Sequence, residues 1–156
     1  MKPRRILKKR PKELRFQIAI KSVQEEVVTV LMDMCAWLAH HHVAREVIEE
    51  LELVLAEALN NVVEHAYLYA ENGEINILLR LRPSQIRVTI TDSGRAFDGP
   101  PQLKDMNVED MDFEELPEGG FGWNLIRTLT DCVEFEHKDK QNRLTLTRNL
   151  GAVASA

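Results

Sequence analysis

The segment AEALNNVVEHAY, residues 56–67, places two asparagines, two glutamates and a histidine in a stretch that otherwise has the pattern of a buried helix. Apolar side chains recur at helical spacing from about residue 45 to residue 66, which predicts one long amphipathic helix. A polar group in a packed interior costs roughly 1–3 kcal/mol when it lacks a hydrogen-bond partner. The polar side chains of this helix therefore require a partner from the protein, from water or from a ligand.

The segments on either side of this helix predict two more helices and two hairpins. Alternating apolar residues indicate strands at residues 13–20, 74–82, 85–92, 132–137 and 142–149. Further helices are expected over 23–40 and 121–131, and Ser22, with Glu25 three residues later, is expected to cap the first of them. Strands joined by short turns pair antiparallel. The sequence therefore predicts an α+β two-layer sandwich, with helices on one face of a mostly antiparallel sheet.

Length and composition favour one cytoplasmic domain. A chain of 156 residues can bury a core of its own. The sequence has no apolar run near the roughly 18 residues that cross a bilayer, and no secretion signal is recognisable at its N-terminus. Cys35 and Cys132 are too few for a disulfide framework or a zinc site, which indicates a reducing compartment, and both are expected to be small core residues.

Charge divides the chain into a basic tail and an acidic body. Residues 1–15 contain eight lysines and arginines against Glu13, so the remainder carries 12 basic and 24 acidic residues, a net charge of −12 against −5 for the whole chain. We interpret residues 1–12 as a tail and residues 13–150 as a single domain. Such a tail could contact nucleic acid or an acidic protein face, but the acidic body repels phosphate backbones. A solvated tail without direct nucleic-acid binding is therefore expected.

Glu57 and Asn61 are four residues apart and so lie one turn apart on one face of the predicted helix. Mg²⁺ prefers oxygen ligands, usually a few from the protein and the rest from phosphates and water, and an asparagine carbonyl can supply one. A carboxylate one turn earlier could polarise a hydroxyl for attack on a phosphoryl group. The same spacing is also common on surface helices, where both side chains are merely solvated.

A second polar cluster, DSGRAF at residues 92–97, follows a predicted strand. A carboxylate only accepts hydrogen bonds, so Asp92 suits an exocyclic amine such as that of adenine. Gly94 lets the chain turn beside a flat ligand. Taken alone, an Asp-x-Gly sequence after a strand is simply a turn.

A third cluster, GGFG at residues 119–122, immediately precedes a predicted helix. Glycines there leave backbone N–H groups free to approach a phosphate, and the helix N-terminus adds partial positive charge. The pattern is neither a Rossmann nor a Walker fingerprint, and it could equally be a flexible hinge. The preceding residues 98–120 lack periodicity and are rich in proline, glycine and acid, which is typical of a functional or disordered loop.

The three clusters occur in one order within about 70 residues, and in that order they resemble the GHKL (Bergerat) ATP-binding fold. EALNNVVEHAY resembles its N-box, DSGRAFD its adenine-binding box, PEGGFGWNLIRTLTD its second glycine box, and VEFEHKDKQNRLTLTRNL its closing hairpin. The resemblance extends from Leu14 to Leu150 and is greatest to the stand-alone anti-sigma factor serine/threonine kinases of bacterial partner switching.

The resemblance implies ATP and Mg²⁺ as cofactors and gives each motif position a role. Glu57 would be the general base for a protein serine hydroxyl, and Asn61 would coordinate Mg²⁺. Asp92, with Gly94 beside it, would bind the adenine amine, and residues 98–120 would form an ATP lid. The other nucleotide-binding positions would be His65, Ala96, Gly120, Phe121 and Gly122.

The function implied is that of an ATP-binding anti-sigma factor with serine kinase activity. It would phosphorylate a STAS-type anti-sigma-factor antagonist and alternately sequester a sigma factor, as a homodimer. Two departures leave an alternative open: Ala96 stands where many relatives have a second glycine, and Lys104 is the single base of the acidic lid. The alternative is a partner-binding module that needs ATP but transfers no phosphoryl group. A third hypothesis, a nucleic-acid regulator, predicts salt-sensitive binding through residues 1–12.

Overall fold

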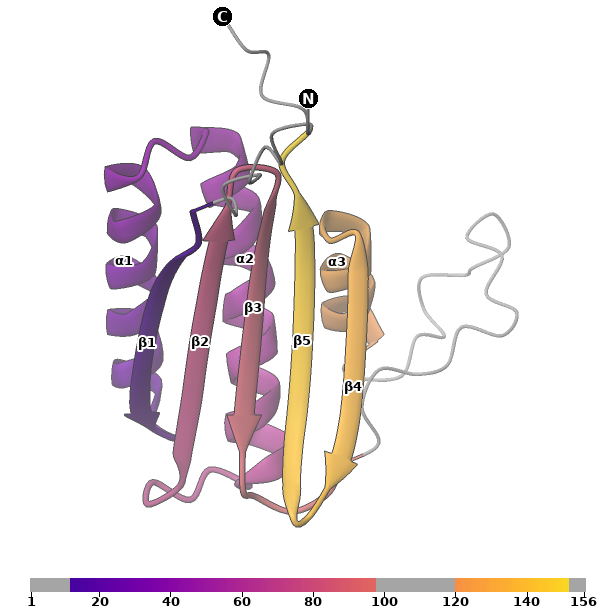
Figure 1. The fold of residues 1–156 in the computed structure, drawn as a ribbon. Coiled ribbons are helices and arrows are strands. Elements are labelled where there is room, and N and C mark those ends of the chain that lie inside the picture. Colours follow the sequence, from indigo (N-terminus) through magenta and orange to yellow (C-terminus); the bar gives the residue numbers. More distant parts are fainter. Residues whose placement is uncertain (1–11, 98–119, 152–156) are drawn as a thin grey trace, which may run out of the picture.

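A five-stranded antiparallel sheet organises the chain in the computed structural model, which describes residues 12–97 and 120–151 (Figure 1). The strands lie side by side in the order β1 (Leu14–Lys21), β2 (Glu74–Arg82), β3 (Gln85–Asp92), β5 (Gln141–Asn149) and β4 (Cys132–Lys138). Every neighbouring pair is antiparallel. Residues 98–119 of the predicted lid and residues 1–11 of the basic tail lie outside the described residues.

Helices cover one face of this sheet, as the sequence predicts (Figure 1). The helical elements are α1 (Gln24–His40), α2 (Arg45–Asn61), a π-helical turn η1 (Val62–Ala66) and α3 (Gly120–Leu129). The helix α2 contacts both α1 and α3, so it lies at the centre of the helical layer. The α+β sandwich with helices on one face is confirmed.

The core lies between the two layers and follows the two periodicities of the sequence. Strand residues that alternate toward the helices are buried: Ile75, Ile77, Leu79 and Leu81 on β2, Ile86, Val88 and Ile90 on β3, and Leu144 and Leu146 on β5. The helices contribute residues at spacings of three and four, among them Leu51, Val54, Leu55, Ala58 and Leu59 of α2. No helix of the described residues lies on the other face of the sheet, which is called here the open face (Figure 1).

Ser22 does not cap α1, and that expectation is wrong. The cap position is Val23, which makes no side-chain capping bond. The buried hydroxyl of Ser22 instead donates to the carbonyl of Ala70 and accepts the Gly73 N–H at 3.1 Å. The carboxylate of Glu26, in the first turn of α1, accepts the Lys21 N–H at 2.5 Å. Ser22 therefore ties the end of β1 to the loop before β2.

Replacing Ser22 by alanine is expected to lower the free energy of unfolding by about 1–3 kcal/mol, because the Gly73 N–H and the Ala70 carbonyl lose a buried partner. Equilibrium urea unfolding followed by circular dichroism measures the change. Thr29→Ala is the matched control, since the Thr29 hydroxyl bonds the Glu25 carbonyl on an exposed helix surface. That control should change stability by less than about 0.5 kcal/mol. Equal costs for the two variants would contradict the assigned role of Ser22.

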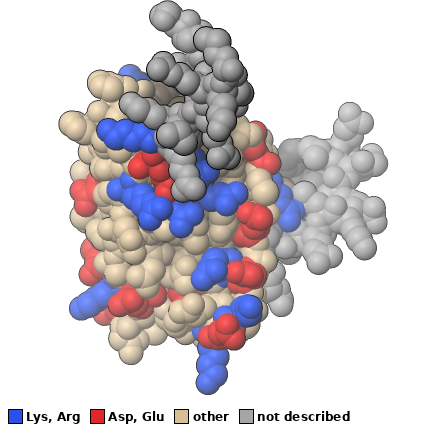
Figure 2. Space-filling view, in the orientation of Figure 1, with Lys and Arg blue, Asp and Glu red and all other residues tan. Residues whose placement is uncertain are grey.

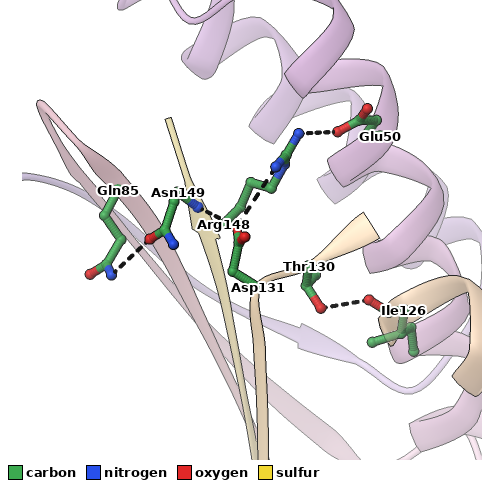
Figure 3. A network of polar contacts seen from close by, with 7 residues as sticks. All are labelled: Glu50, Gln85, Ile126, Thr130, Asp131, Arg148 and Asn149. Carbon is green, nitrogen blue, oxygen red and sulfur yellow. Dashed lines mark hydrogen bonds and ion pairs between the residues drawn. The ribbon is translucent and has the colours of Figure 1, made fainter. Parts of the chain in front are cut away.

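A polar network fixes the end of the sheet that lies far from the C-terminus of α2 (Figure 3). Arg148 of β5 donates to Glu50 of α2 at 2.7 Å, and its second terminal nitrogen lies 3.7 Å from Asp131. The same Asp131 carboxylate accepts the Asn149 N–H at 2.7 Å. Arg148 thus joins the sheet to α2 and to the connection between α3 and β4.

The two cysteines differ in burial. Cys35 is partly buried, whereas Cys132 is exposed, so the expectation that both are core residues is wrong for Cys132. None of the helices within the described ranges combines the length and the apolar character that a bilayer-spanning segment needs.

Candidate nucleotide-binding site

The end of α2 departs from the regular helix that the sequence predicts up to residue 66. Residues Val62–Ala66 form a π-helical turn, in which the Tyr67 N–H bonds the Val62 carbonyl at 3.1 Å. Such turns widen the backbone and are frequent at functional sites. Here two carbonyls at the helix end bond Arg95: its N–H donates to Ala66 at 2.9 Å, and its Nε donates to His65 at 2.9 Å. The helix end is thereby joined to the turn that follows β3.

Gly94 lies in this turn because the backbone of the helix end leaves no room for a side chain. A Cβ at this position would lie 2.6 Å from the carbonyl oxygen of Ala66 and 2.7 Å from its carbonyl carbon. Real Cβ atoms do not approach backbone atoms so closely. The structure therefore explains Gly94 by close packing of two backbone segments, whereas the sequence suggested only a turn beside a ligand.

Gly94→Ala is expected to lower the free energy of unfolding by about 1–3 kcal/mol, because the added methyl must push two backbone segments apart. Thermal and urea unfolding measure the loss. Ser93→Ala is the control, since Ser93 is an exposed neighbour in the same turn. Only the Gly94 variant should be destabilised, and a Gly94 variant as stable as the control would show that the turn can move aside.

Asp92 lies at the end of β3 and is held by a chain of buried hydrogen bonds. It is 3% exposed, and its Oδ1 accepts the Gly94 N–H at 3.0 Å and the Asn142 side-chain amide at 2.8 Å. The same amide nitrogen donates to the Arg95 carbonyl at 3.0 Å, and Asn142 Oδ1 lies 2.8 Å from His137 Nδ1. Oδ2 of Asp92 makes no hydrogen bond to any described residue. The carboxylate is therefore fixed through one oxygen and has the other available as an acceptor.

Burial raises the pKa of the Asp92 carboxyl above its ordinary value, while the bonds from Asn142 and Gly94 and the charge of His137 oppose this rise. The folded protein thus holds an acceptor in a place where ionisation is disfavoured. Such placement costs stability and is typical of a group that has a function.

Asn142 and His137 were not predicted as site residues. Asn142 belongs to the closing hairpin, where the sequence has only an alternating strand pattern. In the sheet, Asn142 is the direct cross-strand partner of Asp92, and His137 is that of Asn142. The strand register would have identified both, because residues directly opposite one another on the same face of a sheet are in contact.

Glu57 and Gly122 are brought together although they are 65 positions apart in the sequence. A Cβ on Gly122 would lie 2.6 Å from Oε2 of Glu57, so the carboxylate lies against the first turn of α3. The free N–H groups at a helix N-terminus carry partial positive charge and favour an anion there. A side chain at position 122 would require this carboxylate to shift from its place.

Asn61 is the last residue of α2, one helical turn beyond Glu57, and is 8% exposed. Its Nδ2 is buried and has no hydrogen-bond partner in the described part of the chain. An orphaned amide of this kind fits a bound phosphate group, whose oxygens accept hydrogen bonds. Turned about its terminal bond, the same amide presents Oδ1, the hard oxygen that Mg²⁺ prefers. The residues present therefore fit a magnesium–phosphate group.

The remaining predicted positions lie around this site with less direct contacts. His65 is exposed, and its ring lies 6.3 Å from that of Phe97 rather than on the Asp92 carboxylate. Ala96 is also exposed. Gly120 and Phe121 form the start of α3, so the glycine cluster reaches into the first helical turn instead of ending before it.

The predicted residues thus gather around α2 and η1 in two groups. Glu57 and Asn61 of α2 lie with Gly122 of α3, and the Asp92–Gly94 turn lies against Ala66 at the end of η1. One group offers a carboxylate, an unpaired amide and a helix N-terminus, and the other offers a fixed hydrogen-bond acceptor. A carboxylate and an amide suit metal and phosphate, whereas a fixed acceptor suits an amine.

The sequence is similar to that of an ATPase domain family and of several serine-protein kinases. The histidine kinase-like ATPase domain family matches residues 20–148. A serine-protein kinase RsbW of Bacillus cereus (strain ATCC 10987) is 28% identical over 127 residues, which cover 80% of this chain and 79% of the relative. A serine-protein kinase RsbW of Oceanobacillus iheyensis is 37% identical over 99 residues, 60% of each chain.

Solved structures share the fold. The RsbU and RsbW domains of Rv1364c from Mycobacterium tuberculosis match with a TM-score of 0.63 and 19% identity, over 88% of this chain and 32% of that chain. The SiaB–SiaC complex from Pseudomonas aeruginosa matches with a TM-score of 0.57 and 14% identity, over 87% of this chain and 89% of that chain. The predicted fold and family are confirmed: the chain belongs to the histidine kinase-like ATPase domain family.

Proposed function

We propose that this protein is an ATP-dependent protein serine/threonine kinase that acts as an anti-sigma factor. It phosphorylates an anti-sigma-factor antagonist and, in its other state, holds a sigma factor. The observation that carries the proposal is the contact of the Glu57 carboxylate with Gly122, one turn from the unpaired Asn61 amide. The family match and the relatives named serine-protein kinase RsbW support it.

In this proposal each residue group has a separate task. Oδ2 of Asp92 accepts a hydrogen bond from the adenine amine, because Oδ1 already accepts hydrogen bonds from Asn142 and Gly94. Asn61 binds on the phosphate side, where Mg²⁺, when bound, neutralises charge on the phosphates. Glu57 takes the proton of a partner serine hydroxyl as that oxygen attacks the γ-phosphoryl group of ATP; the bond from the γ-phosphorus to the β–γ bridging oxygen breaks, and ADP leaves. The fold holds these residues in place, since α2 carries Glu57 and Asn61 and the following turn η1 accepts hydrogen bonds from Arg95, beside Asp92.

The partners remain part of the proposal. A STAS-type antagonist and a sigma factor follow from the resemblance to anti-sigma factor kinases, and the names of the RsbW relatives support a protein serine as the acceptor. Action in the cytoplasm and assembly as a homodimer are further predictions from that resemblance.

A second candidate is a regulatory module that binds ATP and a partner without phosphoryl transfer. The composition of residues 98–120 favours it, because Lys104 is their single lysine or arginine among many acids. Phosphoryl transfer usually relies on positive charge near the developing negative charge. The two candidates share the nucleotide site and differ in whether Glu57 acts as a base.

Transfer of label separates these candidates. The wild-type protein is incubated with γ-labelled ATP, Mg²⁺ and a purified antagonist encoded by a neighbouring gene, and the antagonist with its acceptor serine replaced by alanine is the control. A kinase labels only the serine-bearing antagonist. If no label is transferred while antagonist binding still responds to ATP, the module without catalysis is correct. If neither occurs, both candidates are wrong.

A further inference from the structure

The open face of the sheet carries a row of arginines on adjacent strands. Arg15 of β1 is the direct cross-strand partner of Arg80 of β2, and Arg80 is that of Arg87 of β3. These three residues are named here the arginine row. Their strand neighbours point into the core, so the row projects from the face opposite to the helices. Figure 2 shows this face, with basic side chains gathered in a band across the strands.

Two of the three arginines of the row have no ion pair with a described residue. Like charges directly opposite one another destabilise a sheet, so three adjacent arginines lower the stability of this one. Arg15 is paired with Glu13 at 2.7 Å. Arg80 and Arg87 form no ion pair with any residue in the described ranges, and Nε of Arg80 is buried without a partner. Two adjacent guanidinium groups thus lack a counter-charge.

A hollow of about 440 Å³ lies on this face, and its lining combines hydrogen-bonding side chains with the apolar residues Ile77 and Leu78. Arg80 and Arg87 line it together with Asn76, Thr89, Thr91 and Arg143. A guanidinium group presents its N–H donors in a planar fork that matches a carboxylate. The guanidinium groups in this hollow are therefore suited to bind carboxylates.

We propose that the arginine row is the docking surface for an acidic segment of a partner protein, whose carboxylates bind Arg80 and Arg87 in this hollow. Strands lie about 4.8 Å apart, so the row is only about 10 Å wide. Glu13 borders it at one side, and Glu134 lines the hollow at the other. These acids would repel a long polyphosphate chain that runs past the row, whereas a short acidic segment fits between them.

The docking surface is separate from the nucleotide site. Asp92 is on the buried side of β3 that faces the helices, and Glu57 belongs to α2, whereas the arginine row is on the opposite side of the sheet. A partner bound to the arginine row therefore leaves the nucleotide site accessible. The proposal goes beyond phosphoryl transfer and holds whether or not the protein is a kinase.

The test measures binding of a short fluorescent poly-glutamate peptide to the full chain by anisotropy at low salt. The double variant Arg80→Thr, Arg87→Thr is expected to weaken binding at least about tenfold. Its unfolding temperature should stay equal or rise, because threonine suits a strand and the like-charge contacts are removed. The control Lys138→Thr, Lys140→Thr removes the same charge at the β4–β5 turn and should leave most of the binding. The basic tail is present in all forms.

Four results would overturn the proposal. The first is an unchanged peptide affinity of the arginine variant, and the second is an equal loss of affinity in the lysine control. The third is that a single-stranded oligonucleotide of equal charge binds more tightly than the peptide through the same arginines. The fourth is a change of oligomeric state in the arginine variant. The oligonucleotide result would indicate a nucleic-acid surface, and light scattering would reveal an interface between copies of the chain. ATP binding, measured in parallel, should be the same in all variants, so a failure here is distinct from a failure of the nucleotide site.

Discussion

Glu57→Gln is expected to lower phosphoryl transfer to the antagonist by about 10²- to 10⁴-fold, the usual contribution of a positioned general base. Glutamine has nearly the same shape, so the contact with Gly122 is kept, while its amide does not accept a proton from a serine hydroxyl. ATP affinity should change little, because Glu57 acts on the acceptor hydroxyl and not on the nucleotide. A selective loss of rate therefore assigns Glu57 to the chemical step.

Single-turnover transfer from γ-labelled ATP measures this rate, and calorimetry measures ATP affinity on the same samples. Glu52→Gln is the matched control, since Glu52 is an exposed residue of the same helix and the substitution makes the same change of charge. The control should transfer at the wild-type rate. A Glu57→Gln protein that keeps most of its activity would remove Glu57 from the mechanism.

Asp92→Asn is expected to weaken ATP binding roughly 10- to 100-fold, as expected for a lost hydrogen bond to a charged group. The asparagine oxygen can still accept the Gly94 and Asn142 donors, so the local fold is kept. At the second position an NH₂ group replaces the acceptor and meets the adenine amine donor to donor. Calorimetric titration with ATP measures the change. Asp33→Asn, on an exposed position of α1, should bind ATP as the wild type does.

The same variant should gain stability in a pH-dependent manner. Burial raises the pKa of Asp92 above its ordinary value of 3.8, so the folded protein binds this proton more tightly than the unfolded chain does. This contribution to stability is fully present below the ordinary pKa and is lost as the pH rises through the raised one. Asp92→Asn does not undergo this loss of stability. In urea unfolding, its free energy of unfolding should therefore exceed that of the wild type by a margin that grows as the pH rises above about 4. A constant difference would contradict the pKa assignment.

Most of the fold was predictable because its signals are local. Alternation along the strands and the three-to-four spacing along α1 and α2 depend on which side of each element faces the core. The two-layer arrangement follows from these faces. Ser22 shows the limit: a serine before a helix has the pattern of a cap, but its partners Ala70 and Gly73 lie about 50 residues away. Only the pairing of β1 with β2 brings them together.

For the candidate site, the sequence predicted a set of residues and no geometry. Motif order located Glu57, Asn61, Asp92 and Gly122, but the role of Gly94 depends on a backbone contact with Ala66 that no pattern specifies. The π-helical turn was missed because its apolar spacing resembles that of a regular helix over so short a length. Asn142 was missed because its importance comes from strand register.

The most direct test of the central claim, that these residues form one magnesium–nucleotide site, is calorimetric titration of ATP with and without Mg²⁺ into wild type and Asn61→Ala. The variant should fold normally, since it removes a buried nitrogen that has no partner within the described ranges. We predict that the wild type binds a single ATP per chain more tightly with Mg²⁺, and that Asn61→Ala loses this Mg²⁺ dependence. Absence of ATP binding by the wild type, or an unchanged Mg²⁺ dependence in the variant, would contradict the account.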